Sequence, residues 1–318
     1  MQLNDPSDYP IVIGKTNGII PMKYKGRGLI NIIESGKIFE FQTAYCDDCD
    51  DQYEFVRNYC TQLAQSGTVH AKRIPVLPDY VKADDLDVES GGLVIPFGIE
   101  KQNIKTACVD VTNKYIYPVV AMDTYILESF AGELVKVIDR FSDVKYEIVD
   151  CEKWCDVQLN NARLINDNYD AYVDELFEDV LNRNNGYKQS GLDDSFFDAF
   201  SHRIVVVYGM EKFYNRLDEQ RKDKLNAILI KGQSLFKVHF VMLDSQNYYN
   251  SVNYSDWFKA NVPANEGLYI GDGFGDQYII KPNKHSNSYY DEIGPNFGYA
   301  VSKGKPVIVK VLTTEVEQ

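Results

Sequence analysis

Along residues 92–318, the periodicity of apolar and polar residues switches between that of a strand and that of a helix, which predicts strands and helices in turn. HRIVVVYG (202–209) and KVHFVMLDS (237–245) are so apolar that both faces of each strand must be covered, as in a parallel sheet. This order predicts an α/β fold, a three-layer core around a mostly parallel central sheet. The predicted strands are 92–99, 107–113, 114–121, 145–150, 202–209 and 237–245, and the predicted helices are 126–141, 169–184, 192–200, 217–234 and 246–262.

The first part of the chain has a different pattern. Segments 9–14, 25–33 and 35–44 read as short strands with Gly26, Gly28 and Gly36 at turns. Three such strands bury too little apolar surface to form a core alone. They predict a β fragment that belongs to a larger sheet.

A helix and a linker follow this β fragment. Residues 50–67 show helical periodicity, and 71–81 contain Pro75 and Pro78, which disfavour helix and sheet. The helix would present Phe55, Val56, Tyr59 and Leu63 on one face and end at Gly67. We therefore divide the chain into 1–45, a β-strand remnant; 46–82, helix and linker; and 83–318, the α/β module.

The two ends of the chain share a layout. Asp8, YPIVIGKTNG and Gly28 precede an alternating strand, and Asp276, QYIIKPNKHS and Gly298 precede another at a similar spacing. Repetition of this kind is typical of tandem arrays. We therefore expect residues 1–45 to be the C-terminal strands of a preceding module of the same kind.

Composition narrows the classes of partner. The 318 residues carry a formal charge of -14 and no dense cluster of Lys or Arg, so nucleic acid would be repelled. No apolar run approaches the roughly 18 residues of a membrane span, and the N-terminus is not a signal peptide. The 23 Tyr residues are compatible with a contact surface.

Cysteine and histidine give no convincing metal or catalytic site. Six Cys in this length favour free thiols in a reducing compartment. A zinc site would have to combine Cys46, Cys49, Cys60 and His70, but Asp residues surround the first pair and no second CxxC follows. The four His are scattered. GDGFGD (271–276) has the glycine spacing of a turn rather than of a dinucleotide loop, and we expect a strand, not a helix, after it.

Several segments resemble those of a known family. They are the linker AKRIPVLPDYV, the IPFGI strand and the closing strand pairs. Together with the tandem of α/β modules, they resemble the FtsK/SpoIIIE-type ATPases, and more closely the EssC/EccC coupling proteins of type VII secretion. The resemblance implies that residues 1–68 end a second ATPase module and that about 83–318 form a third, C-terminal one with a P-loop NTPase-like (RecA/FtsK-like) fold. The parent would be a membrane-anchored bacterial protein with these modules in the cytoplasm.

The nucleotide motif of that family is degenerate here. Laid on VVAMDTYILESF (119–130), the glycines of the P-loop G-x-x-x-x-G-K-[ST] fall on Ala121 and Ile126, the lysine on Leu127 and the Ser/Thr on Glu128. Asp123 stands at the start of the helix, where we expect its side chain to cap the amides that a phosphate would use. We expect neither ATP nor Mg²⁺ to bind, and no other cofactor.

The Walker B position departs in the same way. The strand IVVVYGMEKF should end in a metal-binding Asp with an acid beside it, but these positions are Gly209 and Met210. Glu211 stands one place later. If the alignment is shifted by one residue, one acid falls at the Walker B position, but the P-loop that should accompany it is still missing.

The resemblance implies binding in place of hydrolysis. It implies that the third module captures secreted helical-hairpin proteins with a Trp-x-Gly turn through a helical signal, beside neighbouring ATPase modules and in a possible homo-hexamer. An apolar groove would accept such a helix. Candidate walls are Tyr214, Tyr248, Tyr249, Tyr254, Trp257 and Phe258, although packing on their own sheet explains them equally well.

Two other functions stay open. The first is an ATPase that binds nucleotide through a non-standard loop, which would need a Lys or Arg near the loop; Lys114 and Lys136 are the nearest candidates and neither is well placed. The second is a structural spacer that stacks modules in a translocase. The sequence does not locate the groove.

Overall fold

The computed structural model describes residue 3 and residues 5–32, 37–44, 51–66, 75–87 and 91–314. The chain divides into two compact units, Met1–Ile74 and Pro75–Gln318. None of the helices in the described ranges is long and apolar enough to cross a membrane.

The first unit is small. It contains a 3-10 turn at Pro6–Asp8, helix α1 (Tyr9–Ile13), an antiparallel hairpin of β1 (Arg27–Ile32) and β2 (Lys37–Gln42), and helix α2 (Gln52–Gln65). The hairpin and α2 confirm the predicted elements. Asp51 caps α2, because its carboxylate accepts hydrogen bonds from the amides of Tyr53 and Glu54.

The strand predicted at residues 9–14 is wrong, since these residues form α1. The β-branched residues Ile11, Val12 and Ile13 favour a strand, but the prolines favour a helix here. Asp5 accepts hydrogen bonds from Ser7 and starts the 3-10 turn, and Pro10 cannot donate to a sheet but suits the first turn of a helix. The helix ends at Gly14, whose φ is 79°.

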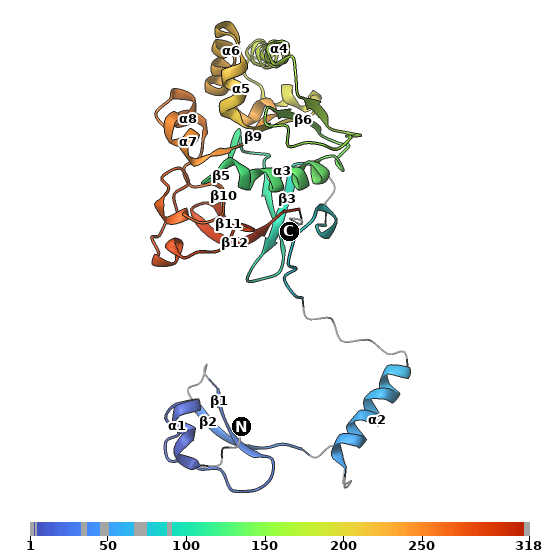
Figure 1. Ribbon diagram of the computed structural model, residues 1–318, viewed down its shortest axis with the longest axis vertical. Helices are drawn as coiled ribbons and strands as arrows, with labels where there is room; N and C mark the ends of the chain where they lie inside the picture. The colour runs from blue at the N-terminus through green and yellow to red at the C-terminus, as the bar shows by residue number, and fades with distance from the viewer. Residues whose placement is uncertain are drawn as a thin grey trace. The chain divides into compact units, whose positions relative to one another are not determined.

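The second unit is built on a ten-stranded sheet (Figure 1). Its order is β4-β3-β12-β11-β10-β5-β9-β8-β6-β7, in which the six strands from β10 to β7 are parallel and the others antiparallel. The strands are β3 (Val94–Glu100), β4 (Thr106–Asp110), β5 (Ile116–Ala121), β6 (Lys145–Asp150), β7 (Arg163–Ile165), β8 (Arg203–Tyr208), β9 (Val238–Ser245), β10 (Gly267–Ile270), β11 (Phe297–Ser302) and β12 (Lys305–Val311).

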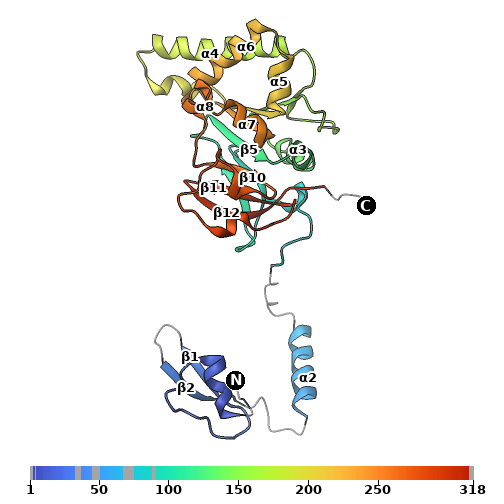
Figure 2. The ribbon, with the colours of Figure 1, turned by 60° about the vertical axis from the view of Figure 1, so that its left-hand side comes forward.

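Helices cover both faces of the sheet, which confirms the predicted three-layer α/β fold. Helix α3 (Thr124–Ile138) packs on one face, and α4 to α8 pack on the other; Figures 1 and 2 show α4, α5 and α6 grouped together at one end of this unit. The helices on the second face are α4 (Tyr169–Gln189), α5 (Met210–Arg216), α6 (Glu219–Lys231), α7 (Gln246–Val252) and α8 (Asp256–Asn261). Short 3-10 turns lie at Ala83–Asp85, Asp194–Ala199, Ser234–Phe236, Phe274–Asp276 and Asn287–Tyr290.

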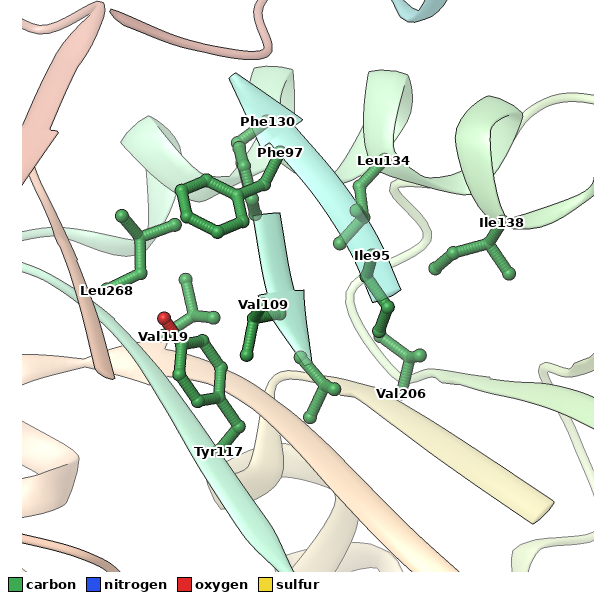
Figure 3. Close-up of a pocket in the computed structure, with 11 residues that line it drawn as sticks. Ile95, Phe97, Val109, Tyr117, Val119, Phe130, Leu134, Ile138, Val206 and Leu268 are labelled. Carbon is green, nitrogen blue, oxygen red and sulfur yellow. The ribbon is translucent and has the colours of Figure 1, made fainter. Parts of the chain in front are cut away.

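Beneath α3 the core is closely packed. Figure 3 shows apolar side chains from α3, including Phe130 and Leu134, meeting Ile95 and Val119 of the sheet. The cavity that remains among them measures about 10 Å³. Such a volume is at the lower limit for one water molecule, so this space is a packing defect and not a ligand site.

A buried ion network lies between the sheet and α4. The Arg203 guanidinium donates to Glu147 Oε2 at 2.7 Å, and the Tyr172 hydroxyl donates to the same atom at 2.9 Å. Arg203 also contacts Asp179 and Glu175 at 3.0 Å each. Glu147 is fully buried, and the Lys145 ammonium lies 2.8 Å from its Oε1.

Two predictions about the second unit need correction, and three short elements were not predicted. Residues 246–262 form two helices, because Ser255 starts α8 after a turn at 253–254. The QYII segment after GDGFGD is not a strand; the Gln277 side chain folds it by accepting from the amides of Ile279 and Ile280. The short strands β7 and β10 and helix α5 were not predicted, since each is too short for a clear periodicity.

The repeated layout corresponds to two similar hairpins. Gly28 and Gly298 each occupy the second position of a first hairpin strand, opposite Phe41 and Val309 respectively. Gly298 is required by packing, because a Cβ there would lie 2.5 Å from the Tyr269 carbonyl oxygen. The origin of the first hairpin in a preceding module stays a prediction.

Candidate functional site

The turn between β5 and α3 is too short to hold a phosphate. Strand β5 ends at Ala121 and α3 begins at Thr124, so only Met122 and Asp123 join them. A P-loop needs several residues between strand and helix, whose amides surround the phosphate. Here the amide of Ile126 already donates to the Asp123 carbonyl oxygen as part of the helix.

The residues at the degenerate P-loop positions do not meet around a common point. Leu127, at the lysine position, is fully buried in the core beneath α3, so a longer side chain there would point into protein. Glu128 is exposed and adds negative charge. Asp123 stands at the N-cap position, but its side chain accepts no hydrogen bond from the helix, which corrects the predicted cap.

At the Walker B position, β8 ends against a carboxylate from another loop. Gly209 follows the strand with φ 76°, and a Cβ there would lie 2.6 Å from Glu152 Oε1. The Lys212 ammonium donates to Glu152 Oε2. Glu152 therefore fills the space that a metal-binding Asp would need, and its charge is paired within the protein.

Glu211 and Met210 take no part in a metal site. Met210 is buried in the core, and Glu211 is exposed in the first turn of α5. The backbone amide of Glu211 donates to Asp244 Oδ2 at 2.8 Å. Among the residues that the structure describes, no group of His, Cys, Asp and Glu could hold a metal ion.

Asp244 is a buried acid that sequence reasoning missed. It lies near the carboxyl end of β9, between the strands of the two degenerate motifs, and is 2% exposed. Burial raises the pKa of its carboxyl to about 6, against hydrogen bonds from the amides of Glu211 and Ser245. Its position as the last acid of an apolar strand was the available signal.

The two lysines that the sequence offers for a nucleotide are paired with acids elsewhere. Lys114 pairs with Glu266 before β5, at the opposite edge of the sheet, and Lys136 pairs with Glu133 on α3. Beside the strand ends, Lys212 is paired with Glu152, and Arg216 donates to the Cys151 carbonyl oxygen just after β6. The residues present do not fit Mg-ATP.

The remaining metal prediction cannot be placed. Cys46, Cys49 and His70 lie outside the described residues. Cys60 is exposed on α2 as a free thiol.

An apolar groove opens on the other face, among helices α5 to α8. Three of the six candidate aromatic residues, Tyr214, Tyr248 and Trp257, line it, and its volume is about 370 Å³. Leu229 and Ile230 of α6 complete the apolar lining, together with Met210 and Val252, while Asn226, Ser255 and Asp256 supply the polar lining. We call this the α5–α8 groove.

Packing fixes the walls of the α5–α8 groove. The Asn226 amide donates to the Tyr214 hydroxyl at 3.1 Å, and Lys222 lies over the Tyr214 ring. Tyr248 and Trp257 are almost buried, whereas Ile230 is 39% exposed. The groove is therefore preformed, with an apolar side chain open to solvent.

The other three aromatic candidates lie elsewhere. Tyr249 is fully buried and its hydroxyl donates to the Met242 carbonyl oxygen, so it is a core residue. Phe258 packs edge-on against Tyr249 and Trp257. Tyr254 is 78% exposed, with Lys259 over its ring, and does not line the groove.

No protein-family model matches the chain, and no curated protein matches it in sequence. Solved structures match it in fold. The cytoplasmic domain of EssC superposes with a TM-score of 0.60 at 16% identity, over 98% of this chain and 62% of that chain. EssC (ATPases 2 and 3) from Geobacillus thermodenitrificans gives 0.62 at 16% identity, over 98% of this chain and 60% of that one.

A third match was solved with a peptide. Thermomonospora curvata EccC (ATPases 2 and 3), in complex with a signal sequence peptide, gives a TM-score of 0.58 at 16% identity, over 99% of this chain and 57% of that one. These likenesses confirm the ATPase-like fold predicted by the resemblance. The chain spans about 60% of the length of these structures.

Proposed function

We propose that this chain is a non-hydrolysing, substrate-recognition module of a type VII secretion coupling ATPase. The observation that carries the proposal is the gathering of Tyr214, Tyr248 and Trp257 on one preformed apolar groove. On the same domain, the turn that should hold a nucleotide has only two residues. The likeness to EssC and EccC structures supports the choice of system.

The α5–α8 groove suits an amphipathic helix. Helix-in-groove recognition uses apolar anchors at i, i+3, i+4 and i+7, which enter a hydrophobic cleft. Ile230 and the aromatic walls offer the apolar contact, and Asn226, Ser255 and Asp256 can bind polar atoms beside it. We propose the helical signal of secreted helical-hairpin proteins with a Trp-x-Gly turn as the occupant.

The parent protein follows from the same reasoning. We propose that upstream modules of the same chain supply ATP hydrolysis and that the whole assembles as a hexamer. The module would face the cytoplasm of a bacterium, on a protein anchored in the membrane by other segments. The signal peptide bound to the Thermomonospora curvata EccC is in line with this assignment.

The test is a binding titration. A fluorescein-labelled peptide from the C-terminus of a Trp-x-Gly protein of the same genome is titrated with the 318-residue chain, and anisotropy is read. We expect saturable binding that Ile230→Glu abolishes, because the charge enters an apolar groove. Tyr254→Glu is the matched control, since Tyr254 is exposed beside the groove but does not line it.

The outcomes separate the three functions. Binding that Tyr254→Glu weakens as much as Ile230→Glu would place the peptide elsewhere. Failure of every such peptide, with no response to nucleotide, would favour a structural spacer. Saturable Mg-ATP binding would favour the motor.

A further inference from the structure

Helix α6 separates two grooves. Asn226, Leu229 and Ile230 face the α5–α8 groove, whereas Ala227, Ile228 and Lys231 line a second one of about 280 Å³ that α6 forms with α4. Figure 1 shows α4 and α6 adjacent at one end of the second unit. We call the second one the α4–α6 groove.

One end of the contact between α4 and α6 is closed by ion pairs. Arg221 and Lys224 of α6 each reach the Asp174 carboxylate of α4 at 2.6 Å. Lys224 also lies over the Phe177 ring. Beyond Phe177, toward the C-terminal ends of both helices, no ion pair joins α4 to α6 within the described residues, and the groove opens.

Polar groups without partners surround this open part. Asn184, Asn185 and Lys188 of α4 and Lys231 of α6 line the groove, and within the described part of the chain their side chains make no hydrogen bond or ion pair. The floor is apolar, formed by Val180 and its neighbours Ile228 and Phe236. Among the described residues, no Asp or Glu lines the groove, although the chain carries a net charge of -14.

The two lysines outweigh the helix dipoles. Lys188 lies in the last turn of α4 and Lys231 in the last turn of α6, where each helix end carries about half a negative charge. Two ammonium groups against two half charges leave a net charge of about +1. The mouth of the α4–α6 groove is therefore positive on an acidic protein.

We propose that the α4–α6 groove binds an acidic peptide segment with an apolar anchor. The anchor enters between Val180 and Ile228, carboxylates of the segment pair with Lys188 and Lys231, and the asparagine amides bind its backbone, since an amide both donates and accepts. The volume is just below the roughly 300–1,000 Å³ of small-molecule pockets and suits one or two side chains. This site is independent of the proposed function, because it lies on the other flank of α6.

The test uses three short fluorescein-labelled peptides that share Leu and Phe anchors and differ in charge. One alternates these anchors with Glu, one with Gln and one with Lys. The full chain is titrated into each at low and at physiological salt. We expect saturable binding of the Glu peptide, weaker at higher salt, and none of the Lys peptide.

Two variants locate the binding. Lys188→Glu with Lys231→Glu should weaken the Glu peptide about tenfold or more, because both charges at the mouth are reversed. Lys259→Glu with Lys303→Glu, which changes the net charge equally on exposed residues outside the groove, should leave it unchanged. Ile230→Glu should also leave it unchanged, which distinguishes this groove from the α5–α8 groove. Circular dichroism confirms that each variant is folded.

Three results would overturn the proposal. The first is equal binding of the Glu and Lys peptides. The second is an equal loss in both pairs of lysine variants, which would reduce the effect to net charge. The third is self-association of the chain, seen by sedimentation, that Lys188→Glu with Lys231→Glu abolishes, which would assign the groove to a second copy.

Discussion

The Glu152 carboxylate occupies the space into which any side chain at Gly209 would have to project, since a Cβ on Gly209 would lie 2.6 Å from Glu152 Oε1. Glu152 follows β6, whereas Gly209 follows β8, and the two strands are neighbours. A metal-binding Asp at position 209 is therefore disfavoured by packing, and the sequence does not supply one.

Restoring that acid should destabilise the protein without restoring activity. Gly209→Asp places a side chain at φ 76° and displaces Glu152, so we expect a loss of about 2–3 kcal/mol in the free energy of unfolding. Gly191→Asp is the matched control, because its φ is 78° and nothing lies within 4 Å of a Cβ there. Urea denaturation measures the loss of stability in both variants. Equal losses would mean that Glu152 moves aside at no cost in free energy.

Nucleotide should leave the stability of the chain unchanged. A site whose dissociation constant is a hundredth of the nucleotide concentration would add about 2.7 kcal/mol. Because the β5–α3 turn has only two residues, we expect no shift in melting temperature with millimolar Mg-ATP. Magnesium tripolyphosphate controls for ionic strength. A shift specific to ATP, with a stoichiometric heat by calorimetry, would support the motor.

Asp244 should make stability depend on pH. Its folded pKa of about 6 exceeds the ordinary aspartate pKa of about 3.8, so the fold accommodates the neutral acid better than the carboxylate. The native state then holds a proton that the unfolded chain has released, and stability falls as pH rises from about 4 to about 6. The contribution is on the order of 2–3 kcal/mol.

Asp244→Asn isolates this effect, because the amide imitates the neutral acid and all other groups cancel in the difference. The stability of the native chain minus that of the variant should fall between pH 4 and pH 6 and stay level above about pH 6.5. Chemical denaturation at several pH values measures it. A difference that does not change with pH would show that the two backbone amides compensate for burial.

Removing only Arg203 from the Arg203–Glu147 pair should cost more stability than replacing both residues by apolar ones. Arg203→Met removes the buried guanidinium from the fully buried Glu147 but leaves the Lys145 ammonium 2.8 Å from its other oxygen, so we expect a loss of about 3 kcal/mol, at the low end for a broken buried pair. Arg203→Met with Glu147→Leu should recover much of that loss, since the buried carboxylate is gone. Thermal denaturation in a double-mutant cycle tests this, and additive losses would contradict it.

Much of the fold was predictable because local patterns determine it. The strands around residues 202–209 and 237–245 are apolar on both faces, so they had to lie inside a parallel sheet between helices. The helix after Ala121 was visible from its periodicity. In contrast, β10 and α5 are too short for a period, and α1 follows proline and cap positions that compete with β-branched residues.

The candidate site was less predictable, because it depends on contacts between distant segments. Tyr248 and Tyr249 are adjacent in sequence, yet the first lines the α5–α8 groove and the second is a core residue. Only the packing of α7 on the sheet distinguishes them.

The sequence by itself determined the class of fold, the position of the turn after β5 and the lack of the P-loop residue types in that turn, since these reside in residue types and short spacings. The tertiary structure alone decided that Glu152 fills the place of a side chain at Gly209, that Asp244 is buried between the two degenerate motifs, and that α6 separates two grooves. Those facts depend on which segments the folded chain brings together, and local periodicity carries no information about that.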